Sequence, residues 1–97
     1  MPETGREEEA VLRLDKDLIA SNVPQIKETI RAELEAGRNM VLDLQEVETM
    51  DSKGIGLLIA THNSLREKGA ALEIVNPTEN ILKLLQNMRL DKHFRIS

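Results

Sequence analysis

Two kinds of hydrophobic patterning alternate along almost the whole of this 97-residue chain. Short, mainly apolar runs have the length of β-strands, and longer segments with apolar residues every three or four positions have the period of α-helices. The strand-like runs are 10–14, 40–44, 71–75 and 93–96. The helical segments run from Val23 to Leu34, from Ser52 to Lys68 and through Ile81 to Met88. The compact run at 40–44 is typical of a strand covered on both faces. The order β-α-β-α-β-α-β predicts an α/β fold, with a mixed sheet backed by helices.

Residues that commonly start and stop helices stand at the edges of these segments. Ser21 and Asn22 can cap the first helix, and Pro24 suits its first turn. Gly37 and Gly69 follow the first and second helices, at positions where glycine often ends a helix. The expected helices therefore have both a periodic interior and suitable ends.

Length and composition limit the kind of protein this can be. Ninety-seven residues make one small domain, which we assign to 10–97, preceded by a polar, acidic tail at 1–9. No apolar run reaches the roughly 20 residues of a membrane span, and the N-terminus lacks the apolar core of a secretory signal. The absence of cysteine excludes disulfides and thiolate metal sites and favours a cytoplasmic protein. A net charge of −4 and a single aromatic residue, Phe94, argue against nucleic acid as a partner.

The usual catalytic arrangements are missing from the sequence. His62 and His93 fall in different expected elements, without the His-Glu-x-x-His spacing of a zinc site. Gly54 and Gly56 supply two glycines of a dinucleotide fingerprint, but the third is absent and no phosphate-binding lysine-serine pair follows. A serine nucleophile needs an adjacent base, and none is near Ser52. We therefore expect no catalytic residue, no metal and no cofactor.

The junction at Asp51-Ser52, where a loop meets the second helix, is the most informative segment. The first N–H groups of a helix lack internal partners and carry partial positive charge, so a serine oxygen can accept from them and a phosphate is well placed there. Gly54 and Gly56 in the first turn each cost up to about 1 kcal/mol relative to alanine, which indicates close approach of a neighbouring strand or a partner protein. A plainer interpretation is that Ser52 is an ordinary cap and the glycines ease helix–sheet packing.

The same segment resembles the motif of the STAS domain (sulfate transporter and anti-sigma factor antagonist) in its small bacterial anti-sigma-factor-antagonist form. That motif is an apolar strand ending in Asp-Leu, a loop, then Asp-Ser-x-Gly-x-Gly and apolar residues. The matching residues are Leu42-Asp43-Leu44 and then Met50-Asp51-Ser52-Lys53-Gly54-Ile55-Gly56-Leu57-Leu58. The resemblance implies a small mixed sheet of four or five strands, with three or four helices mainly on one face.

The resemblance also implies a function. In such antagonists the serine after the aspartate is phosphorylated by a cognate anti-sigma kinase and restored by a phosphatase. By that match Ser52 is the phosphorylation site and Asp51 its motif partner. Lys53 departs from the family pattern, in which a small or hydroxylated residue commonly follows the serine. A lysine there can pair with the phosphate and would change what a kinase recognises.

The implied mechanism is partner switching in transcription regulation. Unphosphorylated protein would bind a serine kinase and anti-sigma factor of the histidine-kinase-like ATPase type, and so release its effector. A serine phosphatase is the second expected partner, and ATP and magnesium would belong to the kinase. The expected partner-binding residues are Thr49, Met50, Asp51, Ser52, Lys53, Gly54, Ile55 and Gly56. Two alternatives are a ligand-sensing or scaffold STAS module without serine phosphorylation, and a small-molecule enzyme, which the missing catalytic groups disfavour.

Overall fold

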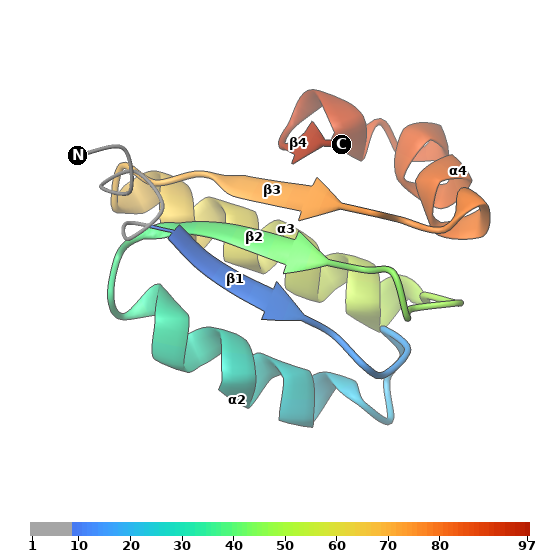
Figure 1. The fold of residues 1–97 in the computed structure, drawn as a ribbon, viewed down its shortest axis with the longest axis horizontal. Coiled ribbons are helices and arrows are strands. Elements are labelled where there is room, and N and C mark those ends of the chain that lie inside the picture. Colours follow the sequence, from blue (N-terminus) through green and yellow to red (C-terminus); the bar gives the residue numbers. More distant parts are fainter. Residues whose placement is uncertain (1–8) are drawn as a thin grey trace.

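Strands and helices alternate along residues 9–97, the part of the chain that the computed structural model describes (Figure 1). The elements in chain order are β1 (Glu9–Arg13), α2 (Val23–Leu34), β2 (Asn39–Asp43), α3 (Ser52–Glu67), β3 (Leu72–Val75), α4 (Glu79–Asn87), the short 3₁₀ helix η1 (Leu90–Lys92) and β4 (Arg95–Ile96). Each expected strand and helix is present, with bounds shifted by one or two residues. The expected tail at 1–9 lies outside the described residues except for Glu9, which opens β1.

The four strands form one sheet in the order β1-β2-β3-β4, and every pairing is parallel. Val11 lies opposite Val41, which lies opposite Glu73, and Glu73 lies opposite Arg95. The expected α/β class is confirmed, but the sheet is parallel rather than mixed. The reason is that a helical segment follows each of the first three strands and returns the chain to the same end of the sheet.

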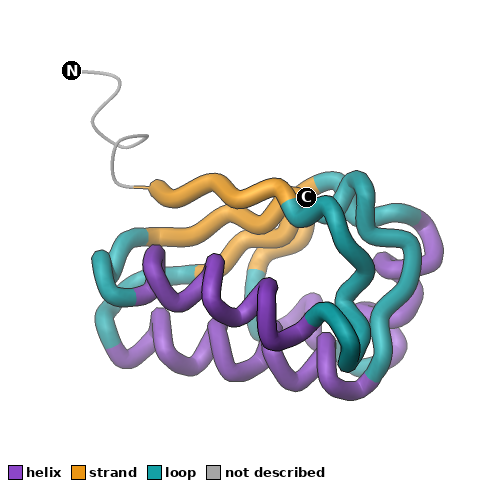
Figure 2. Tube along the Cα trace, turned by 90° about the horizontal axis from the view of Figure 1, so that it is seen from below, coloured by secondary structure: helices purple, strands orange, loops and turns teal. Residues whose placement is uncertain are grey.

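Helices α2 and α3 cover one face of the sheet, and α4 lies beyond the end of β3 (Figures 1 and 2). Side chains on the covered face are buried, with Met40, Leu42 and Leu44 fully inaccessible. On the other face Val11 is 65% exposed and Val41 is half-buried. The expectation that 40–44 is covered on both faces is therefore wrong. Val41 keeps the run apolar although it lies on the open face.

Apolar side chains at helical spacing hold α3 against the sheet. Leu58 and Leu65 are fully buried, and burial of each such side chain stabilises the fold by about 1.5–3 kcal/mol. Thr61 lies between them, and its hydroxyl donates to the carbonyl of Leu57 at 2.7 Å, so its buried oxygen is satisfied. The opposite side of α3 leaves Ser52 and Gly56 exposed.

The loops that follow β1 and β2 lie side by side and fix the beginning of α3. Leu18 and Met50 form an isolated parallel bridge. The Leu18 N–H donates to the Thr49 carbonyl at 3.1 Å, and the Asp51 N–H donates to the Leu18 carbonyl at 3.1 Å. Leu18 is itself fully buried, so it anchors this contact in the core. The first turn of α3 is thereby held at the carboxyl edge of the sheet.

Candidate functional site

Asp51 caps the N-terminus of α3 with both carboxylate oxygens. Oδ1 accepts from the N–H groups of Lys53 and Gly54, each at 3.0 Å. Oδ2 accepts from the N–H of Ala20, in the loop after β1, at 2.8 Å. The backbone of Asp51 is extended (φ −110°, ψ −174°), as an N-cap requires. One side chain thus joins the helix to a loop more than thirty residues earlier in the chain.

These hydrogen bonds favour the ionised form of Asp51. The N–H of Ala20, followed by that of Gly54, lowers the pKa of Asp51 below its usual 3.8, while partial burial acts in the opposite direction and the Lys53 N–H lowers it further. Hydrogen bonds to the charged form of a carboxyl favour that form. A fixed negative charge therefore stands immediately before Ser52.

Ser52 is the first residue of α3, and it is exposed. The interpretation of Ser52 as the helix cap is wrong, because Asp51 occupies the capping position and takes the free N–H groups. Among the residues that the structure describes, the Ser52 hydroxyl has no hydrogen-bond partner. The hydroxyl is therefore available at the surface, beside an ionised carboxylate and the exposed Lys53.

The two glycines of the first turn have different surroundings. A Cβ on Gly54 would lie 2.0 Å from the carbonyl oxygen of Leu18, closer than real atoms approach. A Cβ on Gly56 would meet nothing within 4 Å. Gly54 is thus required by the approach of the Leu18 loop, whereas Gly56 leaves the helix surface bare. The expected close approach of another backbone is therefore found at Gly54, where it comes from the loop after β1 rather than from a strand, and close approach of a partner protein remains a prediction for Gly56.

The eight expected partner-binding residues divide by burial. Thr49, Ser52, Lys53 and Gly56 are exposed, Asp51 and Ile55 are half-buried, and Met50 and Gly54 are buried. Sequence reasoning missed the loop after β1, where Asp17 Oδ1 accepts from the Glu48 N–H at 2.9 Å and Ala20 binds Asp51. The available clue was topological, since parallel strands place the loops at their carboxyl ends on the same edge.

Within residues 9–97 the structure contains neither a candidate metal site nor a helix that could span a membrane. No cluster of three or more histidine, cysteine, aspartate or glutamate side chains there is arranged to hold a metal ion. None of the helices in that range combines the length and the apolar character needed to cross a membrane. The structure does bring His62 and His93 together, with ring centroids 6.1 Å apart, although they come from different elements.

A family model of the STAS domain matches residues 2–97. The chain belongs to the STAS domain family. Over 63 residues it is 27% identical to the anti-sigma-B factor antagonist of Bacillus subtilis, a match that covers 65% of this chain and 58% of that protein. The corresponding antagonist of Listeria monocytogenes is 27% identical over 71 residues, or 72% of this chain and 62% of that one. The chain therefore spans about three fifths of the length of the curated relatives it matches.

Solved structures confirm the STAS-like fold. TM1081 of Thermotoga maritima, a proposed anti-sigma factor antagonist, superposes with a TM-score of 0.85 at 25% identity, covering 93% of this chain and 79% of that chain. The anti-sigma factor antagonist SpoIIAA in its unphosphorylated form gives a TM-score of 0.66 at 26% identity, covering 81% and 74%. Its phosphorylated form gives 0.70 at 24% identity, covering 93% and 83%. This STAS domain is thus a distant relative of anti-sigma factor antagonists.

Proposed function

We propose that this STAS domain is an anti-sigma factor antagonist that switches partners through phosphorylation of Ser52. The observation that carries the proposal is the exposed, unbonded Ser52 hydroxyl, presented at a helix start that Asp51 has already capped. A hydroxyl without internal partners can be modified without breaking the fold. SpoIIAA, a relative by structure, is known in unphosphorylated and phosphorylated forms.

The charge change at this position is large. A phosphate carries about −1.5 to −2 charges at neutral pH. The Lys53 and Gly54 N–H groups that would otherwise receive it are already bound to Asp51. The phosphate therefore stands beside an ionised carboxylate, with the exposed Lys53 ammonium as the neighbouring cation, and it projects its charge outward. A partner that fits the neutral hydroxyl would be repelled.

The proposed contact surface is the exposed part of the expected set. Thr49, Ser52, Lys53 and Gly56 are accessible, with Asp51 and Ile55 at its border. Met50 and Gly54 are buried beneath this surface, and their packing against Leu18 holds the loop and the helix in place. Because Gly56 has no side chain, a partner can approach the helix backbone closely at that point.

The proposed partners are a serine kinase that also acts as the anti-sigma factor, of the histidine-kinase-like ATPase type, and a serine phosphatase. ATP and magnesium belong to the kinase in this scheme, and the STAS domain itself performs no catalysis. The unphosphorylated form binds the kinase and releases its effector. Phosphorylation dissociates the complex, and the phosphatase restores the unphosphorylated form that binds the kinase.

A second candidate function is ligand sensing or scaffolding without phosphorylation. The hollow beside His62 and His93, at the other end of α3, favours this alternative because it is large enough for a small molecule. The two functions use different residues and can be tested separately.

Intact-mass measurement after incubation with the cognate kinase and ATP tests the proposal. We expect a single added phosphate on the wild-type chain and none on Ser52→Ala. Ser21→Ala is the matched control, since Ser21 is also an exposed serine close to the start of a helix. Phosphate on Ser21 or Thr49, with Ser52 unmodified, would refute the assignment.

A further inference from the structure

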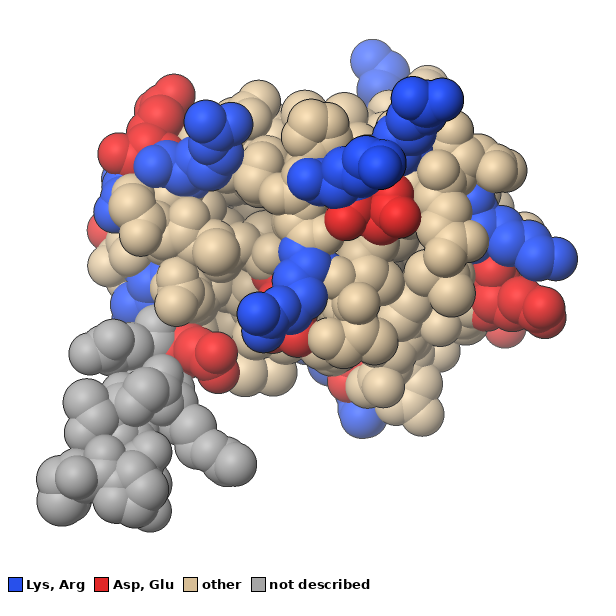
Figure 3. Space-filling view, turned by 90° about the horizontal axis from the view of Figure 1, so that it is seen from above, with Lys and Arg blue, Asp and Glu red and all other residues tan. Residues whose placement is uncertain are grey.

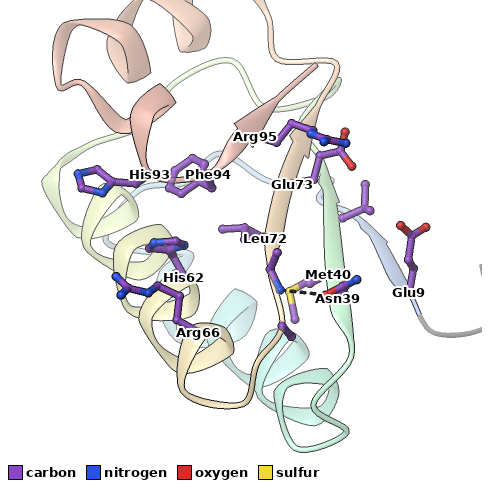
Figure 4. A pocket seen from close by; sticks show the side chains of 13 residues that line it. Glu9, Asn39, Met40, His62, Arg66, Leu72, Glu73, His93, Phe94 and Arg95 are labelled. Carbon is purple, nitrogen blue, oxygen red and sulfur yellow. Dashed lines mark hydrogen bonds between the residues drawn. The ribbon is translucent and has the colours of Figure 1, made fainter. Parts of the chain in front are cut away.

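Two adjoining hollows lie between the second half of α3 and the segment that joins η1 to β4. Their volumes are about 360 Å³ and 150 Å³. Four residues line both hollows: His62, Arg66, His93 and Phe94. Figure 4 shows His62 and Arg66 projecting from α3, with His93 and Phe94 above them. Ligand pockets in proteins begin at about 300 Å³, so the combined space is sufficient for a small molecule.

The space combines an apolar floor with a cationic wall. Phe94 and Leu72, with 5% and 2% exposure, supply the floor of the larger hollow, and Leu90 and Ile59 line the smaller one. Arg66 forms no ion pair within the described residues. The smaller hollow has no acidic side chain in its lining. Figure 3 shows separate Lys and Arg side chains on the face seen from above, with a few Asp and Glu side chains near them and other residues over most of the surface.

Two carboxylates line the far part of the larger hollow, and both lie on the strands. Glu73 accepts from the Ser97 hydroxyl at 2.8 Å and lies opposite Arg95 in the sheet register, so its charge has local partners. Glu9 belongs to β1, two strands away from β3. On the side of α3 the charged side chain that lines both hollows is Arg66, and among the described residues no carboxylate lines the smaller hollow there.

His62 is the second side chain, after Arg66, that could bind a ligand in this space. Its ring packs edge-on against Phe94, with centroids 5.7 Å apart. Its Nδ1 is buried and has no hydrogen-bond partner among the described residues. A buried polar atom without a partner destabilises a fold, so an apolar ring would be more favourable here unless the nitrogen serves a ligand. Burial lowers the pKa of His62, and the electrostatic effect of Arg66 and His93 lowers it further.

We propose that the space between α3 and η1 binds a small organic carboxylate with an apolar body. The carboxylate pairs with Arg66 and hydrogen-bonds the imidazoles of His62 and His93. The apolar body lies against Phe94 and Leu90. The site lies toward the opposite end of α3 from Ser52 and does not depend on phosphorylation there.

Benzoate is the probe for this site, and benzamide is its uncharged counterpart. We expect benzoate to shift the backbone amide signals of residues 59–66 and 90–95 in the full ¹⁵N-labelled chain, saturably and at concentrations up to about 10 mM. Arg66→Gln should weaken binding about tenfold, because a charge-assisted hydrogen bond is lost. Benzamide should bind more weakly than benzoate to the wild-type chain.

Two further variants keep the test specific. Arg31→Gln is the matched control, since Arg31 is likewise an exposed arginine in the last turn of a helix, and it should bind benzoate as the wild type does. His62→Phe should raise the melting temperature, by removing the unpaired Nδ1, while weakening benzoate binding. The proposal is overturned if Arg66→Gln binds benzoate with wild-type affinity, if benzamide binds equally well, or if no saturable shift appears at these residues.

Discussion

Alanine substitutions at Gly54 and Gly56 should have opposite effects on stability. In Gly54→Ala the new methyl carbon would stand 2.0 Å from the Leu18 carbonyl oxygen, 2.7 Å from its carbonyl carbon and 2.8 Å from its Cβ. The Leu18 loop cannot move freely, because hydrogen bonds join it to Thr49 and Asp51. Overpacking of this kind costs about 1–3 kcal/mol, and more where backbone must shift. In Gly56→Ala the space is open, and the better helix propensity of alanine should contribute up to about 1 kcal/mol.

Urea denaturation and thermal melting, followed by far-UV circular dichroism, measure both effects. For a domain of this size each kcal/mol shifts the melting temperature by about 4–8 °C. Gly54→Ala should melt several degrees lower than the wild type, and Gly56→Ala should melt slightly higher. A Gly54→Ala protein as stable as the wild type would refute the packing argument, as would equal destabilisation by both substitutions.

Further predictions concern charge and binding at the same turn. Gly56→Ala should bind the cognate kinase more weakly despite its greater stability, whereas retained affinity in a pull-down would remove Gly56 from the contact surface. Ser52→Ala should change the free energy of unfolding by no more than about 0.5 kcal/mol, because Ser52 makes no cap, and it should stay bound to the kinase. Phosphorylation should weaken the kinase complex at least about tenfold, or ~1.4 kcal/mol, by calorimetric titration, and equal affinities would show that the phosphate is not the switch. The lowered pKa of Asp51 stabilises the fold above the unfolded-state pKa near 3.8 and stops doing so as the pH falls through the folded-state pKa. The wild type should therefore lose more stability than Asp51→Asn on acidification below about pH 4, and parallel pH curves for the two proteins would contradict this cause.

The capping result changes how a phosphate at this position would act. A serine at the capping position would exchange its own hydrogen bonds for those of the phosphate and alter the helix start. Asp51 caps the first turn without using Ser52, so the proposed modification would leave these hydrogen bonds in place and alter the surface charge. The partner, rather than an internal rearrangement, would then detect the phosphate.

Local patterning was sufficient to predict the elements. Alternating periodicities gave the strands and helices, since a strand and a helix expose their side chains with different repeats. Glycines such as Gly37 and Gly69, both with positive φ, marked the ends of α2 and α3. The motif at Asp51-Ser52 placed the candidate site at the start of α3. Each of these signals depends on residues close together in the chain.

Contacts between distant segments were decided by the tertiary structure. The sequence does not show that the Leu18 carbonyl occupies the space beside Gly54, or that Ala20 donates to Asp51, because those partners are more than thirty residues apart. Gly54 and Gly56 look alike in the local sequence for the same reason. Their different roles are seen only in the folded structure, where the loop after β1 packs against Gly54. His62 and His93 likewise became neighbours only because η1 and the segment after it lie beside α3. Local periodicity encodes which segments are helix or strand, whereas the side chains that meet across them depend on how the parallel sheet brings its loops to one edge.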